Sequence, residues 1–145
     1  MRGRAGFSLV ELMVTITVMG LLLGFSVPAI NRYLTQWQLQ QATTTLTSEI
    51  KLLRQRAIAE SRDRRAWFSP GSRFYWFQDP DTYVWTYYLL PPRVIMESVV
   101  FTGGVYDTYM GPDGRSLRSG VIVLRNDLVQ RDTLVVSLSG WVGKP

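Results

Sequence analysis

Hydrophobic residues form three successive patterns along the chain, and each pattern predicts a different kind of element. Residues 12–30 are an uncharged, mostly apolar run of 19 residues, which as a helix would span roughly 28 Å, close to the hydrocarbon thickness of a bilayer. The next segment repeats apolar residues at spacings of three and four, as an amphipathic helix does: Leu39, Ala42, Leu46, Ile50, Leu53 and Ala57. Beyond residue 66, short stretches of aromatic and β-branched residues predict strands.

Turn-forming residues separate these predicted strands. We expect strands at residues 73–77, 82–90, 94–101, 120–124 and 133–139. Residues 79–81 (Asp-Pro-Asp) and 91–92 (Pro-Pro) separate the first three, which therefore read as a meander, and residues 111–115 form a tight turn before the fourth. The predicted fold class is α+β, in which one long N-terminal helix packs on an antiparallel β-sheet head.

The patterns divide the 145 residues into four parts. These are a basic leader (1–6), a transmembrane helix (7–30), an amphipathic helix continuing into the head (31–65) and a β-rich globular head (66–145). Arg2 and Arg4 place the N-terminus in the cytoplasm by the positive-inside rule, so the head lies on the far side. An ordinary secretory signal with a cleavage site before Ile30 is the alternative. The helical periodicity that continues past Ile30 favours the anchor.

Composition removes most enzyme chemistry. The chain contains neither cysteine nor histidine, so it offers no thiolate nucleophile, no imidazole base and no cysteine or histidine metal ligand. We therefore expect no catalytic residue, no metal site and no cofactor. The net charge of +5 is mild and does not by itself indicate a nucleic-acid partner.

Glu11 lies at the start of the apolar run, where a carboxylate in lipid costs a few kcal/mol (about 3) unless it is paired or reaches the interface. A cut between Gly6 and Phe7 would create an α-amino group four residues before Glu11. That group lies one helical turn away within the chain and could equally meet Glu11 from a neighbouring copy. We interpret Glu11 as an assembly residue.

The segment Gly6-Phe7-Ser8-Leu9-Val10-Glu11-Leu12, after a short basic leader, resembles the prepilin signal of type IV pilins and type II secretion pseudopilins. The resemblance implies that a prepilin peptidase cuts after Gly6, that Phe7 becomes N-methylated and that Glu11 docks subunits into a filament. Pro28 falls where these proteins commonly kink the helix. Residues 112–114 (Pro-Asp-Gly), 120–124 and 136–140 resemble the GspH/FimT-like branch of the same superfamily.

The resemblance implies a minor pilin or pseudopilin that primes or caps a type IV pilus or a type II secretion pseudopilus. Its expected partners are the prepilin peptidase, other pilins or pseudopilins in a hetero-oligomeric filament, and an inner-membrane assembly platform. The expected location is the bacterial inner membrane, with a single pass and the head in the periplasm, followed by incorporation into a filament.

The alternative function is DNA uptake by a DNA-binding minor pilin, with nucleic acid as the partner. Its candidate patch consists of Arg62, Arg64, Arg65, Arg115 and Arg118. DNA-binding relatives carry Gly-Arg-x-Arg near the C-terminus, whereas residues 140–143 here are Gly-Trp-Val-Gly. Ordinary ion pairs of Glu60 with Arg56 and Arg64 on the helix surface explain part of the cluster equally well.

Two further groups of residues suggest ligand sites but have simpler explanations. The aromatic residues of segments 74–77 and 83–88 resemble a ligand cage, yet in a small sheet packed on a helix we expect them to form core and cross-strand pairs. Asp107 and Asp113 lack the spaced oxygen donors of a calcium site, and a turn explains Asp113.

Overall fold

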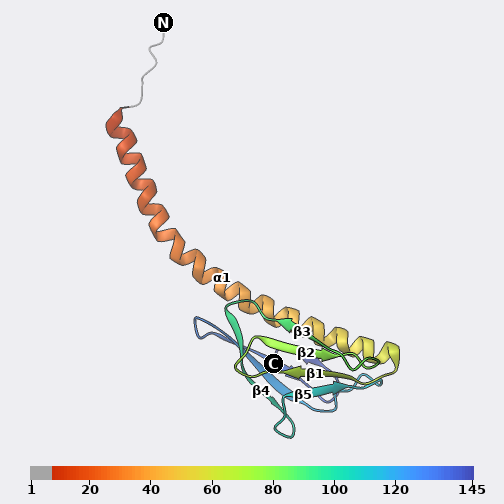
Figure 1. Ribbon diagram of the computed structural model, residues 1–145. Helices are drawn as coiled ribbons and strands as arrows, with labels where there is room; N and C mark the ends of the chain where they lie inside the picture. Colours follow the sequence, from red (N-terminus) through yellow and green to blue (C-terminus); the bar gives the residue numbers. More distant parts are fainter. Residues whose placement is uncertain (1–7) are drawn as a thin grey trace. The chain divides into compact units, whose positions relative to one another are not determined.

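The structure is a computed structural model that describes residues 8–145, apart from the side chains of residues 25–28. The chain divides into two compact units, Met1–Leu34 and Thr35–Pro145. One helix, α1, spans Leu9–Glu60 (Figure 1). The strands are β1 (Arg64–Phe68), β2 (Phe74–Gln78), β3 (Trp85–Leu89), β4 (Val94–Phe101), β5 (Asp107–Met110), β6 (Gly120–Asn126), β7 (Arg131–Val136) and β8 (Val142–Gly143). The predicted α+β class with a long N-terminal helix and antiparallel strands is confirmed.

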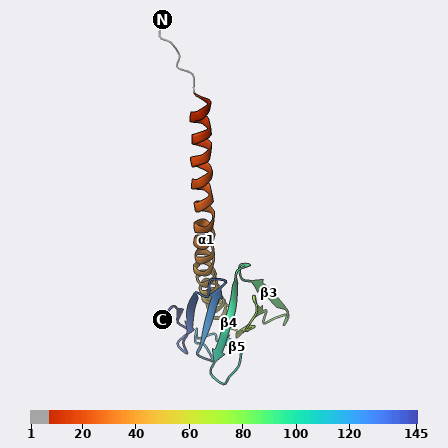
Figure 2. The same cartoon turned by 90° about the vertical axis from the view of Figure 1, so that its left-hand side faces the viewer.

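The strands form two antiparallel four-stranded sheets within the unit Thr35–Pro145, the head. Sheet I has the order β3-β2-β1-β5 and sheet II the order β4-β6-β7-β8 (Figures 1 and 2). β2 and β3 pair as expected, but the predicted meander is wrong at its third strand, because β4 pairs with β6 in sheet II. Residues 91–92 are both proline and have no N–H to donate to a ladder, so the chain leaves sheet I there.

The helix ends at Glu60, five residues before the predicted boundary at residue 65, which lies inside β1. Ser61 adopts a left-handed φ of 52°. The N–H groups of Ser61 and Arg62 donate to the carbonyls of Ile58 (3.3 Å) and Ala57 (3.1 Å), the two bonds of a Schellman cap. This cap reverses the chain, so that the residues after it form β1.

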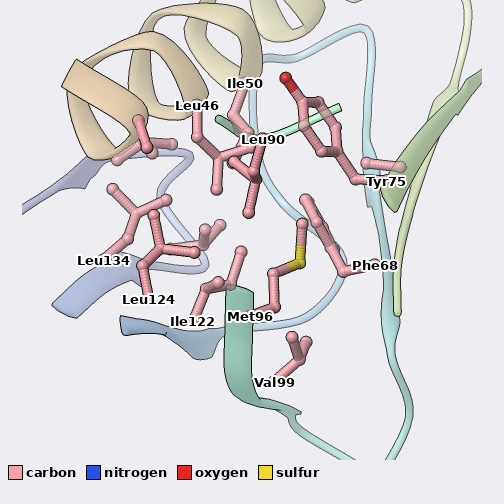
Figure 3. Packing of buried hydrophobic residues seen from close by; sticks show 14 of the residues in the cluster. Leu46, Ile50, Phe68, Tyr75, Leu90, Met96, Val99, Ile122, Leu124 and Leu134 are labelled. Atoms are coloured by element: carbon pink, nitrogen blue, oxygen red, sulfur yellow. The ribbon is translucent and has the colours of Figure 1, made fainter. Parts of the chain in front are cut away.

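The core of the head lies where the apolar stripe of α1 meets both sheets. Leu39, Leu46, Ile50 and Leu53 are at most 5% exposed, as the periodicity predicts. The close-up in Figure 3 shows Leu46 and Ile50 beside Tyr75 of sheet I and above Phe68 of sheet I and Met96, Ile122, Leu124 and Leu134 of sheet II. Each such buried side chain contributes roughly 1.5–3 kcal/mol to the free energy of folding. The complete buried cluster belongs to residues 39–142, within the head.

Two glycines bring the C-terminal segments against the helix. Gly114 and Gly140 have left-handed φ angles of 75° and 77°. A Cβ atom on Gly140 would lie 1.9 Å from the carbonyl oxygen of Gly114, so only glycine permits this approach. The same carbonyl accepts a hydrogen bond from Arg54 Nε of α1 at 2.7 Å. The turn at residues 112–114 and the end of segment 136–140 therefore meet at one point on α1.

A buried tyrosine links α1 to sheet I. The hydroxyl of Tyr75, on β2, donates to Glu49 Oε2 on α1. Burial, reinforced by the neighbouring Glu49 carboxylate, raises the pKa of Tyr75 above its ordinary value near 10. Because the tyrosine in the unfolded chain loses its proton first, the unfolded state binds fewer protons above pH 10. The free energy of unfolding therefore falls as pH rises through that range.

We expect Tyr75→Phe to reduce this alkaline loss of stability, by up to about 1.4 kcal/mol per pH unit above pH 10. Urea unfolding of the head between pH 8 and pH 11 measures the effect. Tyr87→Phe is the control, since Tyr87 is 63% exposed. Identical pH profiles for the native chain and Tyr75→Phe would contradict the assignment.

Candidate functional site

The first part of α1 presents a continuous apolar surface. Its large hydrophobic side chains between Leu9 and Leu23 are 49–74% exposed. By length and composition the helix is sufficient to cross a membrane. The hydroxyls of Thr15 and Thr17 donate to the carbonyls of Glu11 and Met13 at 2.7 and 2.8 Å, which satisfies these polar groups within the helix.

Glu11 lies in the first turn of α1 and is exposed. The unpaired N–H groups of a helix N-terminus favour a negative charge at this position. The predicted cleavage and methylation residues, Gly6 and Phe7, lie outside the described residues. The backbone is helical through Pro28, whose side chain is not described, so the kink there stays a prediction.

The five arginines of the predicted DNA patch each lie beside a carboxylate. Arg62 pairs with Asp81, Arg64 with Glu60, Arg65 and Arg118 with Asp107, and Arg115 with Asp113. The pair of Glu60 and Arg64 was expected on a helix surface, but it joins the end of α1 to β1. Four of the five arginines have contacts of 2.7 Å or less to their carboxylates, and Arg115 lies 3.8 Å from Asp113.

Two of these five arginines, Arg65 and Arg118, share one carboxylate, that of Asp107. Its side chain is 6% exposed and accepts from Arg65 at 2.8 Å and from Arg118 at 2.6 Å. Both guanidinium groups also lie over the ring of Tyr109, 5.0 and 5.6 Å from its centroid. Asp107 is thus an anchor for two stacked arginines, a role that no spacing in the sequence indicates, because Arg65 and Asp107 are 42 residues apart.

Asp113 serves the turn as expected, since its Oδ1 accepts from the backbone N–H of Arg115 at 2.9 Å. Among the described residues, no group of three or more aspartates or glutamates is placed to hold a metal ion. The two aspartates considered for calcium have partners within the protein. Asp107 pairs with arginines, and Asp113 accepts a hydrogen bond from the turn backbone.

The aromatic segments divide between the core and the outer face of sheet I. Tyr75 is buried, and Phe77 and Tyr88 pack against the core, as predicted. The expectation of core positions is wrong for Phe74, Tyr83, Trp85 and Tyr87, which are 38–73% exposed. Strand alternation explains the division, because side chains at every second position point away from α1. Trp67, Trp76, Trp85 and Arg65 line a depression of about 400 Å³ on this outer face.

Comparison with known protein families identifies the N-terminal segment of the chain. Residues 1–27, which include Gly6, Phe7 and Glu11, match the family described as Prokaryotic N-terminal methylation motif. No curated protein sequence matches the chain. The motif and the apolar first part of α1 together indicate a membrane-anchored chain with a soluble head.

Solved structures share the fold at low sequence identity. The type IV minor pilin FimU of Pseudomonas aeruginosa PAO1 is 10% identical, with a TM-score of 0.60 over 78% of this chain and 92% of that chain. The minor pseudopilin EpsH from the Type 2 Secretion System of Vibrio cholerae is also 10% identical, with a TM-score of 0.61 over 74% of this chain and 96% of that chain. The fold is therefore pilin-like.

Because the candidate arginines are already paired, we expect them to contribute little to DNA binding. The combined change of Arg62, Arg64 and Arg65 to alanine should alter the affinity of the head for duplex DNA in gel shifts by less than about threefold. Three lost phosphate contacts would reduce the slope of log K against log salt by about 2.7, whereas we expect almost no change. Lys144→Ala is the control for loss of positive charge. A fall in affinity of orders of magnitude would show that the three arginines form a DNA-binding patch.

Proposed function

We propose that the chain is a minor pilin or pseudopilin, a structural subunit that primes or caps a type IV pilus or a type II secretion pseudopilus. The observation that carries this proposal is the N-terminal methylation motif at residues 1–27, on an apolar helix that continues into a pilin-like head. The fold provides two surfaces for such a role. The exposed apolar part of α1 suits lipid first and neighbouring helices afterwards, and the head offers contacts to unlike subunits.

In this proposal, assembly depends on a charge pair that processing creates. A prepilin peptidase cuts between Gly6 and Phe7, and the new amino group of Phe7 is methylated but keeps its positive charge. Glu11, in the first turn of α1, then has a cationic partner within one helical turn or on a neighbouring subunit. Pairing lowers the cost of a carboxylate in lipid. Pro28 supplies a bend where the helix adapts to the filament.

The proposed location follows from the same segment. The head lies in the periplasm, α1 crosses the bacterial inner membrane before assembly, and an inner-membrane platform transfers the subunit into a filament of other pilins or pseudopilins. The basic leader stays on the cytoplasmic side, in agreement with the positive-inside rule.

We expect protein from the native membrane to begin at Phe7 and to carry one added methyl group. Intact-mass and N-terminal peptide mass spectrometry measures both. A chain that begins at Ile30 would mean a secreted soluble domain, and an uncleaved chain that begins at Met1 would mean a simple membrane anchor. Either result would refute the filament mechanism.

Glu11→Ala should leave cleavage and methylation intact but largely abolish incorporation into filaments. Breaking one side of an ion pair that is shielded from water costs about 3–5 kcal/mol. The measurement is the amount of subunit in sheared or cross-linked filaments relative to processed subunit in the membrane. Thr15→Ala, one turn further along the same helix, is the matched control and should incorporate normally. Normal incorporation of Glu11→Ala would refute the pairing argument.

A further inference from the structure

Sheet I ends in a strand whose outer side has no partner among the described residues. β3 is the outermost strand of the sheet and pairs with β2 alone. Asp79 N–H donates to the Val84 carbonyl, and Leu90 N–H donates to the Arg73 carbonyl, each at 2.9 Å. Positions in an antiparallel pair alternate between bonded and non-bonded. The N–H and C=O groups of Trp85, Tyr87 and Leu89 therefore face the open side.

β3 lacks the features that normally protect such an edge. Residues 82–90 contain no charged residue and no proline, and the register with β2 runs without a bulge. The other edge of sheet I, β5, is covered by a bridge between Met110 and Ser116. β4, an edge of sheet II, carries a bulge between Met96 and Ser98. An exposed, flat, apolar edge strand is a template for pairing with another chain.

The side chains beside this edge form an apolar surface. Trp85, Tyr87 and Leu89 are 38%, 63% and 51% exposed, and register places them next to Phe74, Trp76 and Gln78 of β2 on the same face. The rings of Trp76 and Trp67 are 4.8 Å apart, and those of Trp76 and Phe74 are 6.0 Å apart. Tryptophan, tyrosine and arginine are the residue types enriched at the energetic centres of protein interfaces.

The open hydrogen-bonding groups of β3 favour a polypeptide over a nucleic acid as the partner. Alternating N–H and C=O groups at strand spacing match a second polypeptide backbone, and not the phosphates or bases of a nucleic acid. Nucleic-acid stacking surfaces also use unpaired cations, whereas the charge of Arg65 is directed to Asp107.

We propose that β3 is a strand-addition site for an extended segment of another polypeptide. The segment pairs antiparallel with β3 and is uncharged in its middle, with apolar side chains at alternate positions over the aromatic face. Main-chain bonds hold the segment, and the side chains give specificity. The inference stands independently of the proposed filament role.

A synthetic seven-residue peptide, the length of segment 84–90, tests the proposal. It alternates threonine with valine and has threonine at both ends, so that its three valines lie opposite Trp85, Tyr87 and Leu89. In an antiparallel pair the residues bonded to β3 place their side chains on the aromatic face, so the valine N–H groups face the strand. A peptide N-methylated on its threonines should bind the full chain in detergent micelles. The same peptide N-methylated on its valines should not.

We expect hydrogen exchange of the Trp85, Tyr87 and Leu89 amides to slow by at least about tenfold when the threonine-methylated peptide binds. Tyr87→Pro should weaken binding by about tenfold or more, because it removes an edge donor without removing a ladder bond. Val100→Lys, a change at a 61% exposed position on β4, is the control and should leave binding unchanged.

Three results would overturn the proposal. One is equal binding of the two N-methylated peptides, which would exclude main-chain pairing. Another is concentration-dependent dimerisation of the full chain that Tyr87→Pro abolishes, which would make a second copy the occupant. The third is protection of the same amides by a thirteen-nucleotide oligothymidine and not by the peptide, which would make the face a nucleic-acid surface.

Discussion

The head depends on burial of one helical stripe between two sheets. Leu39, Leu46, Ile50 and Leu53 supply the helical side of the only extended apolar cluster within the described head, and both sheets contribute the remainder. Neither four-stranded sheet has another described helix to cover its inner face. The second part of α1 is therefore the element on which the packing of both sheets rests, while its first part leaves its apolar side chains exposed. One continuous helix therefore carries a buried apolar stripe in its second part and an exposed apolar surface in its first part.

Periodicity in the sequence was sufficient to predict the helix, its buried stripe and the range of β4, because each rests on local repetition. The left-handed cap at Ser61 was not predictable, since glycine normally marks that position. The assignment of β4 to sheet II and the addition of β5 to β1 depend on contacts between distant segments. The alternation of side chains along β2 and β3 likewise does not determine which of the two faces of these strands lies against α1.

The arginines show that the assignment of a functional site, too, depends on contacts between segments that are distant in the sequence. Composition and spacing gather positive residues after the helix and around residue 115, and a linear reading turns them into a patch. In the folded head each lies beside a carboxylate, and the most buried of these carboxylates, Asp107, comes from a strand that periodicity did not predict. What distinguishes a DNA-binding surface from a solvated ion-pair surface is pairing in space. The N-terminal motif, by contrast, lies within one continuous stretch of the sequence and can be recognised without the structure.

The contact of Gly140 with the carbonyl of Gly114, which Arg54 also binds, has a consequence for the order of folding. Gly140 follows seven of the eight strands along the chain, so this contact can form only long after the helical stripe has been synthesised. A nascent chain therefore carries an uncovered stripe through most of the synthesis of the head and completes its core only when the segment around residue 140 is available. A chain whose synthesis stops before Gly140 would lack this contact and would keep apolar surface exposed to chaperones and proteases.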